Sequence, residues 1–369
     1  MRIGIKELVL ILAALAAGGL LFAWSGIFNI AASSGHWAIT KWFLHYTMHQ
    51  SVETHAMGIE TPPLDDIAMV QRGAGHYATG CAPCHGAPGT ERSPVALEMT
   101  PHPPTLVPHI EVFEPRELFW IVKNGVKYTG MPAWAGHERD DEVWSVVAFL
   151  LRLDELDEAG YRELAHGEAA RRGEPLDGPV LAALGGAPPE PLAGCARCHG
   201  RDGNGRGTGA FPRLSGQSEA YLLASLLAYA RETRNSGIMT PAVSGIGEGE
   251  LARLAAHYAR QAPPDTGSGP APDEELVEQG RRIARDGVPV DGVPACLSCH
   301  GERRRPVYPA LAGQHADYLA GQLRLFRDGG RGGTPFAHLM ETVARRLDDG
   351  QIEAVSAFLA SLPPEHATP

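Results

Sequence analysis

The stretch Cys81-Ala-Pro-Cys84-His85 is the first of three versions of one pattern in this chain of 369 residues. The second is Cys195-Ala-Arg-Cys198-His199 and the third is Cys296-Leu-Ser-Cys299-His300, so the pattern takes up all six cysteines of the protein. Successive copies begin 114 residues apart (from position 81 to 195) and 101 residues apart (from 195 to 296). This spacing predicts three tandem repeats, each of the size of a small domain.

Two thiols one helical turn apart, followed at once by a histidine, form the attachment signature of c-type haem. The thiols form thioethers with the two vinyl groups of one porphyrin, and the histidine lies under the iron as its proximal ligand. The sequence therefore predicts three covalently bound haem c groups, each with one iron. The residues expected to hold them are Cys81, Cys84, Cys195, Cys198, Cys296 and Cys299 by attachment, and His85, His199 and His300 by ligation.

Three other uses of paired cysteines fit the pattern less well. A zinc site needs a second pair of ligands at a suitable distance, and it leaves the adjacent histidine unexplained. A thioredoxin-like redox pair needs a βαβ context, which this sequence lacks. Structural disulfides would not recur with a histidine after every pair. Haem attachment is thus the favoured interpretation.

A low-spin haem iron needs a second axial ligand, and methionine is a usual one in electron carriers. Each repeat has a methionine at a similar distance after its first cysteine: Met131 at 50 residues, Met239 at 44 and Met340 at 44. We expect these three as the distal ligands, although filling the core is the commonest role of a methionine. The rival ligands are Met99, His102, His109 and His137 in the first repeat and His338 in the third.

The segments after these methionines repeat as well. Glu142-Val143, Glu250-Leu251 and Gln351-Ile352 follow the methionines at the same distance, and an apolar pattern of helical period continues from each. This predicts one closing amphipathic helix in every repeat. Helical-period segments alternate with Gly/Pro loops along the chain and strand-like alternation is almost absent, so the predicted fold class is all-α.

The sequence resembles the class I cytochromes c over nearly all of residues 66–363. The second and third repeats resemble the two halves of the cytochrome c4 type, because 212–222 (PRLSGQSEAYL) matches 309–319 (PALAGQHADYL). The resemblance implies three cytochrome c-like haem domains in tandem. Arg234 and Arg331 would pair with haem propionates or lie as solvated charges, and Gln217 and Gln314 would shape the turn beside the porphyrin.

The N-terminal region is long and apolar enough to cross a bilayer, since residues 8–32 carry no charge and about 20 such residues suffice. Arg2 and Lys6 precede it, so the positive-inside rule places everything after it outside the cytoplasm. We expect an uncleaved single-pass anchor in the inner membrane, with the haem domains in the periplasm. The alternatives are a signal peptide cleaved at Ala14-Leu15-Ala16 and a buried soluble helix.

The predicted organisation follows from these segments. Residues 33–65, rich in aromatic residues, would form an amphipathic helix near the membrane surface, on a partner or against the first haem domain. The expected boundaries are 1–32 for the transmembrane anchor, 33–65 for the juxtamembrane segment, 66–156, 191–262 and 273–363 for the cytochrome c domains, and 157–190 and 263–272 for the linkers.

The composition narrows the function. A formal net charge of −11 disfavours nucleic acid as a partner, and it would steer redox proteins that carry a basic docking surface. A histidine on one side of an iron and a methionine on the other leave no coordination position for a substrate. We therefore expect an electron carrier without catalytic residues. The expected function is a membrane-anchored triheme relay to a terminal oxidase. The alternatives are an electron-accepting subunit of a periplasmic dehydrogenase and a haem peroxidase-like enzyme.

Overall fold

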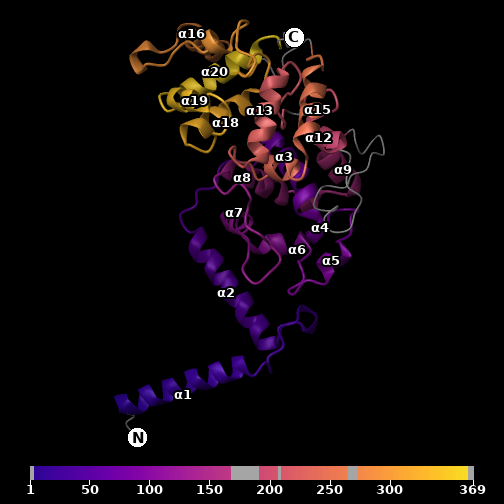
Figure 1. Cartoon of the computed structure of the whole chain (residues 1–369), viewed down its shortest axis with the longest axis vertical. Helices are drawn as coiled ribbons and strands as arrows, with labels where there is room; N and C mark the ends of the chain where they lie inside the picture. The colour runs from indigo at the N-terminus through magenta and orange to yellow at the C-terminus, as the bar shows by residue number, and fades with distance from the viewer. Residues whose placement is uncertain (1–3, 168–190, 207–208, 265–272, 365–369) are drawn as a thin grey trace.

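The computed structural model describes residues 4–167, 191–206, 209–264 and 273–364. Within these ranges the chain forms helices and turns but no strand, and its only β-type pairs are the isolated bridges Ala87–Thr90 and Val288–Val293. The predicted all-α fold class is confirmed. Figure 1 shows the N-terminal helix at one end of the molecule, the first repeat in the middle and the third repeat at the far end.

The first repeat contains the longest series of elements. They are α3 (Ile67–Gly80), α4 (Ala82–His85), α5 (Pro94–Leu97), α6 (Leu106–His109), η2 (Ile110–Val112), α7 (Pro115–Asn124), α8 (Asp140–Leu150), η3 (Leu153–Glu155) and α9 (Glu158–His166). Its core is rich in aromatic residues: the Phe119 ring stacks on Trp144 at 4.3 Å, and Tyr77 contacts Phe149 at 5.0 Å.

The second and third repeats share one plan. The second contains α12 (Pro191–His199), α13 (Glu219–Ala230), α14 (Met239–Val243) and α15 (Glu248–Ala259). The third contains α16 (Glu274–Asp286), η4 (Pro289–Asp291), α17 (Leu297–His300), α18 (Ala316–Arg327), α19 (Ala337–Ala344) and α20 (Asp349–Ser361). The three predicted closing helices are α8, α15 and α20, and each has several buried apolar residues.

The opening and closing helices cross in close contact in the first and third repeats, and a glycine makes each crossing. A Cβ on Gly73 of α3 would lie 1.9 Å from the carbonyl oxygen of Ser145 in α8. A Cβ on Gly280 of α16 would lie 1.9 Å from the carbonyl oxygen of Ala354 in α20. The two helix backbones therefore touch at these points, which any larger side chain would prevent.

The predicted linker 157–190 needs a correction at its start. Asp157 caps α9 by accepting a hydrogen bond from the Gly160 amide, and Tyr161 on this helix is buried in the core of the first repeat. The spacing of Tyr161, Leu164 and Ala165 is that of an amphipathic helix, a signal masked by the surrounding charges. The rest of this linker, 168–190, and nearly all of the linker 263–272 lie outside the described residues.

Two helices precede the first repeat. The helix α1 (Ile5–Trp24) has a mean hydropathy of 2.1 over its apolar window and none of it is buried, so it is long and apolar enough to span a membrane. The short turn η1 (Ala32–Ser34) leads to α2 (Ala38–Ala56). The C-terminal half of α2 packs on α7, where the His55 ring lies 5.5 Å from that of Trp120 and Val52 is buried. The His49 ring stacks on Phe113, just before α7, at 5.0 Å. Of the three placements expected for this segment, the structure shows contact with the first repeat.

Candidate haem sites

One continuous cavity of about 1920 Å³ runs through the three repeats. The cavity is lined by all of the residues that the sequence selected: Cys81, Cys84, His85, Met131, Cys195, Cys198, His199, Met239, Cys296, Cys299, His300 and Met340. The fold thus brings each predicted set of haem residues to one connected interior space.

The three histidines of the pattern make the same hydrogen bond. Nδ1 of His85 donates to the Pro104 carbonyl at 2.9 Å, because a carbonyl oxygen can only accept. His199 does the same to Pro212 and His300 to Pro309, both at 3.1 Å. This bond places the proton on Nδ1 and leaves Nε2 of each ring as a lone pair for a metal. Burial also lowers the pKa of all three histidines, which favours the neutral, ligating ring.

The first cysteine of each pair lies in surroundings that disfavour a thiolate. Burial raises the pKa of Cys81 to about 12 and that of Cys195 and Cys296 to about 11. Thiol redox chemistry needs an accessible thiolate. In the part of the chain that the structure describes, no group of three or more His, Cys, Asp or Glu side chains could hold a metal ion. These observations disfavour the zinc and thioredoxin-like interpretations.

The predicted distal methionines lie on segments held by hydrogen bonds. The Met131 amide donates to Thr129 Oγ1 at 3.0 Å, and the Met239 amide donates to Ser236 Oγ at 2.9 Å at the start of α14. Met340 lines the cavity from α19, whereas its rival His338 does not. In the first repeat Met99 lines the cavity as well, and a Cβ on Gly130 would lie 2.6 Å from the Met99 sulfur.

The remaining rivals of Met131 divide into two groups. His102 and His109 line the cavity, as Met99 does, whereas His137 does not. The first repeat thus has two sulfur atoms close to one loop, and the choice of Met131 stays a prediction.

Family models match each of the three repeats. A model described as subunit III of cbb3-type cytochrome c oxidase matches residues 68–150, and the cytochrome c model matches 192–256 and 277–363. A thiosulfate dehydrogenase electron acceptor of Thiomonas intermedia is 37% identical over 180 residues, 48% of this chain and 82% of the relative. Cytochrome c4 of Azotobacter vinelandii is 38% identical over 181 residues, 46% of this chain and 84% of the relative. This chain is a class I c-type cytochrome.

The solved structures matched include reduced cytochrome c4 from Pseudomonas stutzeri, 33% identical, covering 46% of this chain and 94% of that one, with a TM-score of 0.43. The family assignment confirms the sequence interpretation: cytochrome c domains with c4-type repeats, covalent haem c and electron transfer rather than catalysis. The residues that this cytochrome presents to its cavity fit that cofactor, since paired thiols, a histidine with a free Nε2 and a methionine line the cavity in every repeat.

Two buried arginines of this cytochrome further support the fit. Arg234 and Arg331 are only 5% and 9% exposed, and both line the cavity. Each bonds to a tyrosine of the other repeat, Arg331 to Tyr221 at 3.3 Å and Arg234 to Tyr318. Among the described residues no carboxylate pairs with either guanidinium, and burial together with Arg234 lowers the pKa of Arg331. Two buried cations without a counter-charge call for an anion, and the carboxylates of haem propionates would supply it.

Two buried glutamines connect the second and third repeats of the cytochrome. Gln314 accepts from the Arg213 amide and donates to the Arg213 carbonyl, both at 3.0 Å. Gln217 accepts from the Ala310 amide at 2.9 Å and donates to the Ala310 carbonyl at 2.8 Å. We expected each glutamine to shape its own turn, but each reaches the backbone of the other repeat. Sequence alone gives no signal for a contact between residues about 100 positions apart.

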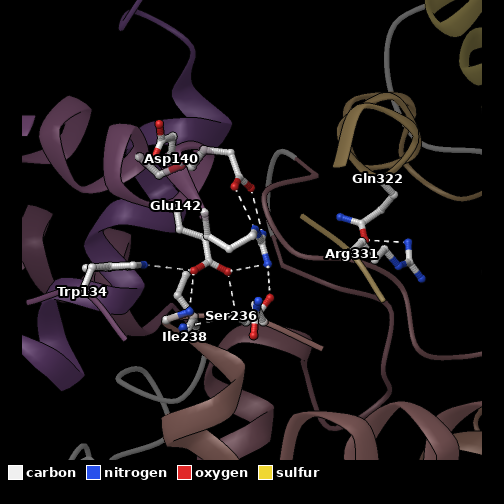
Figure 2. Close-up of polar contacts among 12 residues, drawn as sticks. Trp134, Asp140, Glu142, Ser236, Ile238, Gln322 and Arg331 are labelled. Carbon is white, nitrogen blue, oxygen red and sulfur yellow. Dashed lines mark hydrogen bonds and ion pairs between the residues drawn. The ribbon is translucent and has the colours of Figure 1, made fainter. Parts of the chain in front are cut away.

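A carboxylate that the sequence did not select connects the first and second repeats. Glu142, at the start of α8, accepts from Ser236 Oγ at 2.6 Å, from the Gly237 amide at 2.7 Å and from Trp134 Nε1 at 3.2 Å (Figure 2). It also pairs with Arg139 at 2.9 Å. Burial raises the pKa of Glu142, and the nearby Arg139 opposes this rise. The first repeat therefore holds the loop that carries Met239.

Proposed function

We propose that this cytochrome carries three haem c groups and relays single electrons along the periplasmic face of the inner membrane. The observation that carries the proposal is the continuous cavity, which joins three equivalent sets of residues in one interior. When bound, each haem iron exchanges one electron between its ferrous and ferric states. The proposed axial ligands are His85 and Met131, His199 and Met239, and His300 and Met340.

The surrounding residues suit electron transfer better than substrate chemistry. The proline carbonyls orient the histidine rings, and the methionines would close the other side of each metal, so no coordination position is left open. His199 and His300 are each only 8% exposed, so their rings lie away from bulk water. Both features reduce the rearrangement that a change of oxidation state requires, which favours rapid electron exchange.

The arrangement of the repeats suggests a direction. The apolar helix α1 lies at one end of the molecule, the first repeat lies in the middle and the third repeat lies at the other end (Figure 1). The first repeat matches an oxidase subunit model, and relatives of the chain include electron acceptors of thiosulfate dehydrogenase. We therefore propose that electrons enter at the c4-type repeats from a periplasmic dehydrogenase and leave from the first repeat to a terminal oxidase. The net charge of −11 favours partners with basic docking surfaces.

The proposal is tested on the full-length protein purified from membranes in detergent. The intact mass should show three added haem groups, and N-terminal sequencing should show that α1 is retained. Thiosulfate dehydrogenase with thiosulfate should reduce the cytochrome, and membranes that contain a cbb3-type oxidase should then oxidise it. Fewer than three haems, a cleaved α1 or an absence of either reaction would overturn the corresponding part of the proposal.

One variant distinguishes the site where electrons enter the cytochrome from the site where they leave it. Met131→His should lower the potential of the first haem alone, because a second histidine ligand lowers the potential relative to methionine. Oxidation by the oxidase should slow while reduction by the dehydrogenase stays unchanged. Met57→His is the matched control, since Met57 is an exposed methionine outside the cavity. Equal slowing of both reactions in Met131→His would contradict the direction of flow.

A further inference from the structure

The glutamine contacts between the second and third repeats end on one particular peptide group. The Ala310 amide, which donates to Gln217 Oε1 at 2.9 Å, belongs to the same peptide as the Pro309 carbonyl. That carbonyl accepts the hydrogen bond from Nδ1 of His300 at 3.1 Å. A continuous chain of hydrogen bonds thus runs from the His300 ring through the Pro309–Ala310 peptide to Gln217 of the other repeat.

The same chain occurs in the opposite direction. The Pro212 carbonyl accepts from Nδ1 of His199 at 3.1 Å, and the amide of the same peptide, on Arg213, donates to Gln314 Oε1 at 3.0 Å. Gln217 and Gln314 occupy equivalent positions in the two repeats, five residues after Pro212 and Pro309. The two chains are therefore related by the symmetry of the repeats.

Both chains lie in the interior. Gln217 and Gln314 are each 5% exposed, and the backbone residues that they contact, Arg213 and Ala310, are 5% exposed as well. Each glutamine amide uses its oxygen and its nitrogen on the same backbone residue of the other repeat. A side-chain amide that makes two hydrogen bonds to one residue is held in one orientation. In a low-dielectric interior, hydrogen bonds that form a chain also strengthen one another.

We propose that Gln217 and Gln314 are positioning residues that tune the axial histidine of the other repeat, and through it the reduction potential of the other haem. The inference rests on the proposed function only in that His199 and His300 bind haem iron. An acceptor on the N–H side of a peptide draws electron density toward its carbonyl oxygen. The carbonyl then accepts more strongly from Nδ1–H, and the histidine becomes a more basic ligand.

The sign of the effect separates this role from simple packing. A more basic histidine stabilises ferric iron, so each glutamine lowers the potential of the haem across the boundary. Loss of the glutamine should therefore raise that potential. Loosening of the interface would act in the opposite direction, because water admitted near a haem stabilises the more highly charged ferric state and lowers the potential.

The experiment uses the full-length protein with substitutions at the two glutamines. Gln217→Leu should raise the midpoint potential of the haem attached to Cys296 and Cys299, and Gln314→Leu should raise that of the haem attached to Cys195 and Cys198. The haem of the first repeat should not change in either variant. Reference variants with a histidine in place of Met239 or Met340 identify which redox transition belongs to which haem.

Two further substitutions control for indirect effects. Ser218→Ala removes another hydrogen bond across the same boundary, from Ser218 Oγ to the Pro306 carbonyl, together with the N-cap bond that Ser218 Oγ accepts from the Tyr221 amide, and it touches neither peptide beside a histidine. It should leave both potentials unchanged. Gln217→Glu keeps an oxygen that accepts from the Ala310 amide, and it should not raise the potential. The ring Nδ1–H resonance of His300, followed by NMR with labelled histidine, should move in Gln217→Leu in the direction of a weaker hydrogen bond.

The outcomes distinguish the inference from the function on which it rests. Loss of haem, or the absence of methionine-ligated spectra in the wild-type protein, would refute the proposed ligation. Three intact haems with unchanged potentials in both leucine variants would overturn the tuning role. So would a shift of the haem in the substituted repeat itself, or a fall of the potential instead of a rise.

Discussion

Replacing Glu142 with alanine tests whether the first repeat holds the methionine loop of the second. Glu142 is 6% exposed and accepts hydrogen bonds from Trp134, Ser236 and Gly237 in addition to its ion pair with Arg139. The Ser236 hydroxyl in turn accepts from the Met239 amide at 2.9 Å. Two hydrogen bonds therefore connect this carboxylate to the backbone of the predicted iron ligand.

The size of the effect follows from what the alanine leaves behind. Removing one partner of a buried ion pair costs about 3–5 kcal/mol, and each buried donor without an acceptor costs about 1–3 kcal/mol. Arg139 keeps its two contacts with Asp141 at 2.8 Å, so its charge is not stranded. The Ser236 hydroxyl can rotate toward another acceptor. We therefore expect Glu142→Ala to reduce the free energy of unfolding by about 3 kcal/mol.

Two measurements check this expectation. Denaturant titration followed by circular dichroism gives the stability, and the sulfur-to-iron charge-transfer absorbance reports the methionine ligands. Glu142→Ala should weaken the absorbance of one haem of three. The matched control is Asp141→Ala, because Asp141 is 51% exposed in its ion pair and surface pairs contribute at most about 1 kcal/mol. Equal losses of stability in the two variants, or an unchanged charge-transfer band in Glu142→Ala, would refute the reasoning.

Three shorter predictions follow. Burial lowers the pKa of His315 to about 4, so protonation of this side chain opposes folding. The free energy of unfolding should therefore fall by at most about 3 kcal/mol as the pH drops from 6.5 towards 4. His315→Gln should flatten this pH dependence in thermal melts at several pH values. Gly73→Ala should lower stability by about 1–3 kcal/mol in denaturant titrations, because its Cβ would meet the α8 backbone, whereas Gly249→Ala, at an exposed position of α15 with open space around it, should not. Met340→His should lower the potential of the third haem in a potentiometric titration, and His338→Ala should leave it unchanged.

The sequence predicted what depends on short-range patterns. The Cys-x-x-Cys-His turns and the closing helices are local, and their residue types and periodicity are visible within a window of a few turns. The helix α9 is not evident from the sequence, because its apolar residues, Tyr161 among them, are few and lie between charged side chains. The sequence does not decide which surface α2 packs against, since an amphipathic helix has the same pattern on a membrane and on a protein.

The contacts between the repeats could not be predicted from the sequence. Glu142 is 94 residues from Ser236, and Gln314 is 101 residues from Arg213. A single sequence holds no periodicity that connects such positions, and glutamine or glutamate near a turn is common on protein surfaces. Only the fold shows that these side chains are buried and which backbone groups they reach.

These contacts give the second repeat a special place in the chain. Its histidine side is reached from the third repeat, because Gln314 bonds to the peptide that accepts from His199. Its methionine side is reached from the first repeat, through Glu142 and Ser236 to the Met239 amide. The first and third haem sites have no such double connection among the described residues. The reduction potential of the middle haem should therefore respond to the packing of both the first and the third repeat against the second. The reduction potential of each outer haem should depend mainly on its own repeat or on one neighbouring repeat.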